Sequence, residues 1–339
     1  MARTADSTST STNARLVGID RIREAAAVLS GVTVRTPLVA FGAAADRHFL
    51  KAESLQPIGA FKLRGAYFAI STLTPDERAR GVITYSSGNH AQGVARAALL
   101  LGVPAVVVMP SDAPKLKARR VATDGAEIVV VGTASSERRI VAERIAAERG
   151  LAIIPPYDDD RVIAGQGTCG LEIVEDLPDV AAILVPIGGG GLASGVAAAV
   201  HALRPGTRVI GVEPELAADA RDSLAADRIV EWPAELVGRT IADGTRTQAL
   251  GERTFLHLAA LLDSVVTVSE AEIAASVRLI AEESRLVAEP SGALSVAALR
   301  FHAAEADLVG IDGPVVAIVS GGNIDPDRYR HYLEAPIPD

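Results

Sequence analysis

The chain has 339 residues, of which 49% are hydrophobic, and its 33 basic and 42 acidic residues give a net charge of -9. This length and apolar content support at least one buried core and exclude global disorder, while the acidic balance argues against a nucleic-acid partner. The single Cys169 has no partner for an internal disulfide, so we expect a protein of the reducing cytoplasm.

Two segments need a decision before the fold is considered. Residues 1–18 begin with a Ser/Thr-rich tract that has neither a signal-peptide nor a transit-peptide pattern, and we expect a disordered tail. Residues 180–200 carry no charge and are long enough to span a bilayer. Pro186 and four consecutive glycines interrupt them, where a lipid-exposed helix would lose backbone hydrogen bonds. We therefore predict a strand, a glycine loop and a buried helix, and no membrane partner.

From residue 82 onward, short β-branched runs alternate with longer helical patterns. This alternation predicts an α/β fold of two lobes, each a parallel or mostly parallel sheet flanked by helices, with a cleft between them. The predicted strands are residues 82–85, 105–109, 127–131, 151–154, 182–187, 209–213 and 315–319. The predicted helices are residues 91–101, 115–123, 135–149, 163–175, 192–203 and 270–281.

Four consecutive glycines, Gly188, Gly189, Gly190 and Gly191, stand between a predicted strand and a predicted helix. Without Cβ atoms the backbone can turn its N–H groups inward, and the helix start adds a positive dipole end, so the loop favours phosphate binding. A tight turn without a ligand is the alternative, but it needs only two glycines. The spacing of Gly188, Gly190 and Ala193, with Glu213 at the end of the next strand, also fits a dinucleotide-binding fold.

A second cluster, Ser86, Ser87, Gly88, Asn89 and His90, follows one predicted strand and opens a helix. Hydroxyls, an amide and free backbone N–H groups at a helix start favour binding of a substrate carboxylate. Ordinary helix capping is the alternative, although five such groups in sequence exceed what capping needs.

Lysine is scarce, since only Lys51, Lys62, Lys115 and Lys117 could supply an amine nucleophile. Lys62 lies beside an aromatic residue in an apolar stretch, where we expect desolvation and the neighbouring Arg64 to favour the neutral, nucleophilic amine. The alternative is a surface lysine that extends from a helix into solvent.

Five motifs occur in order along the chain: KAESLQPIGAFKLRGA, SSGNHAQGVA, IAGQGT, PIGGGGL and SGGN. Together they resemble the fold type II pyridoxal-phosphate enzymes, and among these the serine/threonine dehydratases (threonine ammonia-lyases) and serine racemase. The resemblance covers roughly residues 19–330. It implies a large cofactor-binding domain of residues 19–75 and 158–339 and a small inserted α/β domain of residues 76–157.

The resemblance also implies a role for each motif. Lys62 would hold pyridoxal 5'-phosphate as a Schiff base with Phe61 beside the ring, and Asn89 would bind the ring hydroxyl. Gly188 to Gly191 would hold the phosphate, and Ser320 would face the pyridine nitrogen. The substrate carboxylate would bind Ser86, Asn89 and His90.

Three further positions follow from the same resemblance. Glu213, the Ala217 carbonyl and Asp219 fall where relatives bind a divalent cation, and these donors suit Mg²⁺ or Ca²⁺; solvated surface charge is the alternative reading of the two acids. Two positions depart from the family pattern. Ala60 stands where many relatives have serine, and Tyr157 stands where racemases tend to carry asparagine.

The implied reaction is β-elimination of a 3-hydroxy amino acid, L-threonine or L-serine, to a 2-oxo acid and ammonia. Serine racemisation and 3-hydroxyaspartate ammonia-lyase activity are alternatives within the family, and a dinucleotide-binding α/β protein is the alternative outside it. Ser87 would be the proton donor opposite Lys62 that racemisation requires. Because relatives are commonly dimers or tetramers, we expect a homo-oligomer, and the short segment after Asn323 leads us to expect no regulatory domain.

Overall fold

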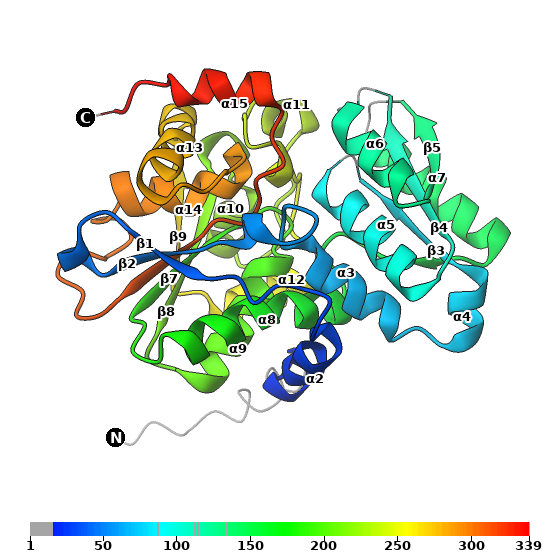
Figure 1. Ribbon diagram of the computed structural model, residues 1–339, viewed down its shortest axis with the longest axis horizontal. Helices are drawn as coiled ribbons and strands as arrows, with labels where there is room; N and C mark the ends of the chain where they lie inside the picture. Colours follow the sequence, from blue (N-terminus) through cyan, green and yellow to red (C-terminus); the bar gives the residue numbers. More distant parts are fainter. Residues whose placement is uncertain (1–15, 87, 112, 114, 133–134, 339) are drawn as a thin grey trace.

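The computed structural model describes residues 16–86, 88–111, 113, 115–132 and 135–338. Most of the predicted tail, residues 1–15, lies outside the described residues, as does Ser87. The described part contains a six-stranded and a four-stranded sheet, which lie side by side with their helices in Figure 1. The predicted α/β fold class is confirmed.

The larger sheet is built from both ends of the chain, in the order β1-β2-β10-β7-β8-β9. β1 and β2 pair antiparallel, and every other neighbouring pair is parallel. Its strands are β1 (Leu38–Phe41), β2 (His48–Lys51), β7 (Ala182–Pro186), β8 (Arg208–Pro214), β9 (Ser264–Val268) and β10 (Val315–Ile318).

The smaller sheet is wholly parallel and uses one continuous stretch of chain, in the order β5-β4-β3-β6. Its strands are β3 (Val82–Tyr85), β4 (Ala105–Pro110), β5 (Glu127–Val131) and β6 (Ala152–Ile153). The prediction of a four-residue strand at 151–154 was wrong in length, because only Ala152 and Ile153 pair with β3.

Helices cover both faces of each sheet. In chain order they are α2 (Ile19–Leu29), α3 (Lys62–Ser71), α4 (Pro75–Arg80), α5 (Asn89–Leu101), α6 (Lys115–Thr123), α7 (Ser135–Arg149), α8 (Asp160–Asp176), α9 (Gly191–Leu203), α10 (Asp219–Ala225), α11 (Ala234–Val237), α12 (Glu252–Leu261), α13 (Glu270–Ser284), α14 (Pro290–Phe301) and α15 (Pro326–Leu333). Short 3₁₀ turns are η1 (Ala44–Asp46), η2 (Glu53–Leu55), η3 (Glu215–Ala217) and η4 (Asp243–Thr245).

Alternate residues of the buried strands supply two cores. On β7, Ala182 and Leu184 face a cluster with α13 and α14, whereas Ile183 and Val185 face a cluster with α8 and α9. This double burial explains the continuous apolar runs, because a parallel sheet covered on both faces has no polar side. The uncharged segment 180–200 indeed forms β7, the glycine loop and buried α9. Among the described residues, no helix has the length and apolarity needed to cross a membrane.

Candidate active site

Lys62 begins α3 and directs its amine at a main-chain oxygen. Its Nζ donates to the Pro156 carbonyl at 2.7 Å and lies 5.0 Å from the Phe61 ring centroid. The residue surface is only partly enclosed, but protein atoms crowd the amine, and this burial lowers the pKa of Lys62 from its ordinary value of 10.5 to about 8. The expected effect of desolvation is confirmed, and a substantial neutral fraction of the amine is available near neutral pH.

Arg64 does not contribute to that effect, so this part of the prediction was wrong. Side chains two positions apart in a helix, such as those of Lys62 and Arg64, point to roughly opposite sides. The Arg64 guanidinium is 1% exposed and donates to both Glu53, at 2.8 Å, and Glu172, at 2.7 Å. Its charge is neutralised behind the helix, away from the Lys62 amine.

The glycine loop connects β7 to α9 and approaches neighbouring atoms very closely. A Cβ on Gly189 would lie 2.1 Å from Tyr157 Cδ1, and one on Gly188 would lie 3.1 Å from Thr245 Cα. Gly190 has φ +89°, which side chains rarely allow. No side chain caps the first turn of α9 among the described residues. Free N–H groups at a buried helix start fit a phosphate.

Two adjacent residues join the lysine to the glycine loop. Pro156 accepts the hydrogen bond from Lys62, and the Tyr157 ring packs on Gly189. The Tyr157 backbone also lies 3.1 Å from where a Cβ on Gly191 would stand. The structure therefore brings together two motifs that are more than a hundred residues apart in the chain.

The Ser/Gly/Asn/His cluster forms the turn from β3 into α5. Ser86 Oγ accepts from the Gly88 N–H at 3.2 Å, and α5 starts at Asn89 without a side-chain cap among the described residues. The first N–H groups of the helix thus remain available for an anion. Ser87, the predicted proton donor, lies outside the described residues.

The His90 ring is buried and neutral. Burial, together with the positive charge of Lys62, lowers its pKa to about 3. His90 Nε2 lies 3.0 Å from the Ile154 carbonyl, which only accepts, so we assign the proton to Nε2 and a lone pair to Nδ1. A ring with this tautomer has no donor left for a carboxylate, which leaves the backbone N–H of His90 as the anion-binding group.

Asn89 is held by two residues from the end of the chain. Its Nδ2 donates to Glu289, and its Oδ1 accepts from Asn323 Nδ2 at 2.9 Å. Burial raises the pKa of Glu289 to about 7, although Lys117 opposes this. Lys117 reaches from α6, with Nζ 3.1 Å from Asp243 and 4.0 Å from Glu289.

The sequence analysis did not single out Glu289, Lys117 or Asp243. The run EPSG, a proline at the start of a helix after an acid, was the local signal that could have drawn attention to Glu289. The distant partners of Lys117 have no such signal.

Ser320 follows β10 by two residues and lies beside the lysine motif. Its carbonyl accepts from the Phe61 N–H at 3.1 Å, and Ala60 bridges to Gly321. The Ser320 hydroxyl makes only a long bond of 3.4 Å to the Ser291 carbonyl, so it can rotate towards another partner.

The predicted metal residues lie at the end of β8, and their two carboxylates are fully buried. Glu213 accepts from the backbone N–H groups of Ala220 and Arg221 at 2.9 and 2.8 Å. Neither oxygen of Asp219 has a partner in the described structure. Burial raises the pKa of both carboxyls, and Asp219 further raises that of Glu213.

Buried and unpartnered carboxylate oxygens fit a cation, and the reading of these acids as solvated surface charge is wrong. No cluster of three or more His, Cys, Asp and Glu ligands occurs in the described part of the chain, and the candidate donors are two acids, Glu213 and Asp219, with the Ala217 carbonyl, which ends η3.

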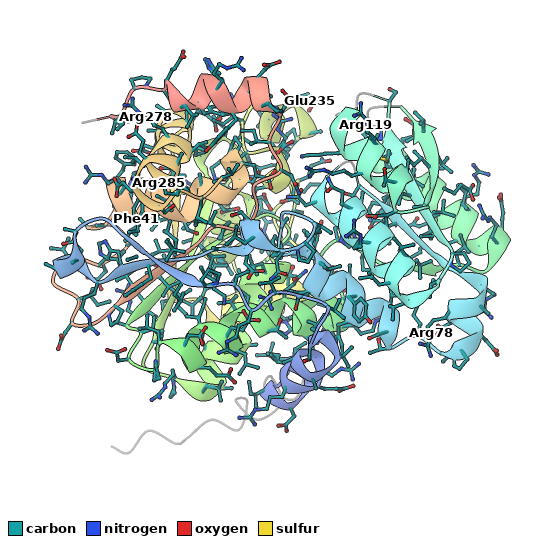
Figure 2. The ribbon with its side chains drawn as sticks, viewed as in Figure 1. Phe41, Arg78, Arg119, Glu235, Arg278 and Arg285 are labelled. Atoms are coloured by element: carbon teal, nitrogen blue, oxygen red, sulfur yellow. The ribbon has the colours of Figure 1, made fainter. Side chains whose placement is uncertain are left out.

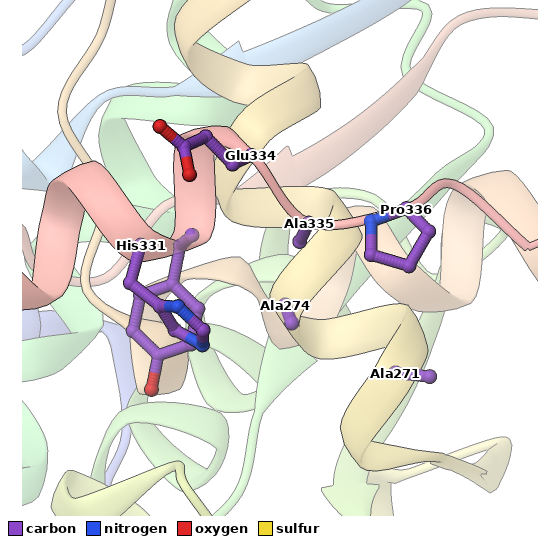
Figure 3. A pocket seen from close by; sticks show the side chains of 7 residues that line it. Ala271, Ala274, His331, Glu334, Ala335 and Pro336 are labelled. Carbon is purple, nitrogen blue, oxygen red and sulfur yellow. The ribbon is translucent and has the colours of Figure 1, made fainter.

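A surface recess of about 340 Å³ lies elsewhere, between α13 and the C-terminal segment (Figure 3). Its lining residues are Ala271, Ala274, His331, Tyr332, Glu334, Ala335 and Pro336. None of them belongs to the motifs above, and we assign the recess no role in the site.

Several known proteins are similar to this chain over most of its length. The chain is 44% identical over 281 residues to L-threo-3-hydroxyaspartate ammonia-lyase of Saccharomyces cerevisiae, covering 83% of this chain and 84% of that protein. It is 41% identical over 318 residues to L-threonine ammonia-lyase of Thermotoga maritima, covering 91% and 76%. The structure of maize serine racemase superimposes with a TM-score of 0.88 at 37% identity, covering 94% and 97%.

A family model described as pyridoxal-phosphate dependent enzyme matches residues 29–321, which include the lysine, the glycine loop and Ser320. The chain therefore belongs to the pyridoxal-phosphate dependent enzyme family.

Proposed function

We propose that this protein is a pyridoxal-phosphate-dependent ammonia-lyase that dehydrates and deaminates a 3-hydroxy amino acid, with L-threonine and L-serine as the first candidates. The observation that carries the proposal is the Lys62 amine, crowded by protein and joined to the glycine loop through Pro156 and Tyr157. Relatives named L-threonine ammonia-lyase and L-threo-3-hydroxyaspartate ammonia-lyase support the reaction type.

The residues present fit the cofactor. Lys62 Nζ would attach it, Phe61 would lie beside its ring, and Gly188 to Gly191 would hold its phosphate through backbone N–H groups. Asn89 would donate to its ring hydroxyl, and the rotatable Ser320 hydroxyl would donate to its ring nitrogen. When bound, pyridoxal phosphate supplies the electron sink that makes the Cα–H bond of an amino acid breakable.

The chain's own side chains would bind the substrate and move its protons. The first turn of α5, with Asn89, His90 and the Ser86 hydroxyl, would hold the substrate carboxylate. Lys62, with its lowered pKa, would accept the Cα proton. Loss of the β-hydroxyl then yields an enamine that hydrolyses to the 2-oxo acid and ammonia. Ser87 would supply a proton from the opposite face and so permit slow racemisation.

The lysine assignment has a direct test. The cofactor-loaded protein should show a near-visible absorbance band that shifts on borohydride treatment, and mass spectrometry should place the reduced adduct on Lys62. In Lys62→Ala both the band and ammonia release from threonine should be lost, whereas Lys51→Ala should not relocate the adduct. An adduct on any other lysine contradicts the proposal.

Substrate choice within the family is the second question. The relative from yeast favours 3-hydroxyaspartate as the alternative to threonine and serine, and serine racemase structures favour racemisation. Ammonia release from L-threonine, L-serine and L-threo-3-hydroxyaspartate, compared as kcat/KM, decides between the eliminations. Chiral analysis of recovered serine, with Ser87→Ala as the matched variant, measures racemisation.

We also propose that Glu213, Asp219 and the Ala217 carbonyl hold Mg²⁺ or Ca²⁺. The support is chemical, since two neighbouring carboxylates are buried and neither oxygen of Asp219 has a hydrogen-bond partner in the described structure, which is costly without a ligand. A cation at a hundred times its dissociation constant stabilises the folded state by about 2.7 kcal/mol. After chelation, adding CaCl₂ or MgCl₂ should raise the melting temperature of the wild type but not of Asp219→Asn, and an equal response in both would contradict the site.

Domain organisation and assembly remain proposals of the same kind. We propose a large cofactor domain of residues 19–75 and 158–339 and a small domain of residues 76–157, since the two sheets use these separate stretches. We further propose a cytoplasmic homo-oligomer, dimer or tetramer. The buried, unpaired Cys169 suits a reducing compartment, and light scattering on the cofactor-loaded protein measures the assembly.

A further inference from the structure

A continuous series of side-chain hydrogen bonds runs from helix α6 to the residue proposed to bind the ring hydroxyl. Arg120 donates to Asn323 Oδ1, and Asn323 Nδ2 donates to Asn89 Oδ1 at 2.9 Å. Asn89 Nδ2 in turn donates to Glu289, whose other oxygen lies 4.0 Å from Lys117 Nζ. Arg120 and Lys117 are three residues apart and therefore share one face of α6.

The Arg120 end of this series fixes the direction of the bonds between the side chains. Arginine is a donor only, whereas each asparagine amide could in principle be turned around. At the other end, Lys117 favours the ionised, accepting form of Glu289. Turning Asn323 would place its NH₂ against the Arg120 guanidinium and its oxygen against two carbonyl oxygens, those of Asn89 and Ile58. Three favourable contacts would become three repulsive ones.

Asn323 determines the orientation of the Asn89 amide. With Asn323 Nδ2 directed at it, Asn89 must present Oδ1 on that side, and its NH₂ is then left for Glu289 and for one further acceptor. The reversed amide would place NH₂ against NH₂ at Asn323 and oxygen against oxygen at Glu289.

Two glycines make this arrangement possible. A Cβ on Gly59, which has φ +74°, would lie 2.4 Å from Asn323 Oδ1. A Cβ on Gly321 would lie 2.3 Å from Glu289 Oε1 and 3.2 Å from Asn89 Nδ2. Larger residues at these positions would displace the amides, so the GAFK and SGGN motifs provide the space for the series.

We propose that Arg120 and Asn323 are positioning residues that hold the Asn89 carboxamide with its NH₂ turned away from Asn323, ready to donate to the cofactor's ring hydroxyl. The inference rests on the proposed function, since it concerns the same cofactor site. It adds that an exposed arginine on α6, outside the five motifs, helps to set the electronic state of the cofactor.

The measurable consequence is spectroscopic. Donation from Asn89 favours the ionised form of the ring hydroxyl, so the balance between the two absorbing forms of the bound cofactor reports the amide orientation. Loss of one such hydrogen bond changes an equilibrium by about three- to tenfold. A purely structural role for Arg120 would alter the melting temperature and leave this balance unchanged.

The experiment compares variants of the full chain loaded with pyridoxal phosphate, read by near-visible absorbance at fixed pH. Arg120→Ala should change the ratio of the two forms about three- to tenfold and lower kcat more than it raises KM, whereas Arg120→Lys, which keeps a donor, should recover most of the wild-type ratio. Asn323→Asp, which cannot donate to Asn89, should show the larger change.

Arg119→Ala is the matched control, because it removes the same charge from an adjacent exposed position on α6, labelled in Figure 2. If the ratio of the two absorbing forms in Arg120→Ala equals that of wild type and of Arg119→Ala, the inference is overturned. This comparison remains valid even if Asn323→Asp fails to fold. A wild-type protein with no near-visible band would instead refute the proposed function itself.

Discussion

Two buried lysines of this protein have opposite surroundings. Lys51 is 0% exposed and bonds the Glu172 carboxylate at 2.6 Å and the Thr36 carbonyl at 2.7 Å. Lys62 meets a carbonyl at the same distance of 2.7 Å, but no carboxylate pairs with it among the described residues. The comparison teaches that burial alone does not make a lysine reactive. An ion pair makes it structural, and the lack of one leaves the amine free to give up its proton.

The two environments lie on opposite sides of the first turn of α3. Lys51, Glu53, Arg64 and Glu172 form a network whose two positive and two negative charges cancel. The Lys62 amine stands on the other side with a lowered pKa. Because its charges cancel, the network holds the start of α3 in place without adding an electric field at the Lys62 amine.

Breaking the network should have the largest effect. Arg64→Met leaves Glu53 and Glu172 buried without their main partner, and we expect a loss of about 3–5 kcal/mol in the free energy of unfolding. Urea denaturation followed by the fluorescence of the single Trp232 measures it. Arg139→Met, which removes one partner of an exposed pair with Glu143, should cost less than about 1 kcal/mol. Similar losses in both variants would refute the network's importance.

Substitution by methionine should change the free energy of unfolding in opposite directions at the two lysines. In cofactor-free protein at pH 7, Lys62→Met removes a desolvated charge and should stabilise the fold by about 2–3 kcal/mol. Lys51→Met removes one of the two cations that bind Glu172, leaving it to Arg64 alone, and should destabilise the fold.

The gain in Lys62→Met depends on pH with a defined sign. Between about pH 8 and 10.5 the folded wild type releases the Lys62 proton while the unfolded chain keeps it, so wild-type stability rises with pH. The advantage of Lys62→Met should therefore shrink through this window. A constant advantage from pH 7 to 11 would show that the lowered pKa is not its cause.

A neutral partner of the network should matter less. Thr36 donates its hydroxyl to Glu53 at 2.6 Å and is fully buried. Thr36→Val should cost about 1.5–3 kcal/mol in thermal or urea unfolding, because the bond is to a charged group but Arg64 remains. The same change at exposed Thr123 serves as the control, and equal costs would argue against the prediction.

The smallest effect concerns the aromatic ring beside the amine. The Phe61 ring favours the protonated form of Lys62, since the ammonium lies 5.0 Å from its centroid. Phe61→Leu should lower the pH midpoint of Lys62 acetylation in cofactor-free protein by about half a unit. Quantitative mass spectrometry of the labelled peptide measures the shift, and an upward shift would count against a cation–π contact.

The sequence predicted those features whose cause is local. The glycine loop, the turn into α5, the smaller sheet and the three central strands of the larger sheet follow from short patterns of residue type, and the structure has them. It did not predict β1, β2 and β9. Each of these strands is only partly buried, and β2 and β9 contain polar residues that interrupt the apolar run that marked the central strands, whereas β1 has only four apolar residues.

The rest of the site depends on contacts between distant segments. Lys117 and Asp243 are 126 residues apart, and Asn89 and Glu289 are 200 apart. The predicted effect of Arg64 on Lys62 was wrong for the same reason. The two acids that bind Arg64, Glu53 and Glu172, lie before and well after it in the chain. Side-chain direction on a helix is set by such tertiary partners, which the local sequence does not reveal.

The packing of Tyr157 limits how this enzyme could be converted into a relative. Its ring fills the space above Gly189, and its neighbour Pro156 accepts the Lys62 amine. Exchanging Tyr157 for the asparagine that we expect in racemases would leave a void beside the glycine loop. This substitution should therefore need compensating substitutions around the loop before it could change the activity.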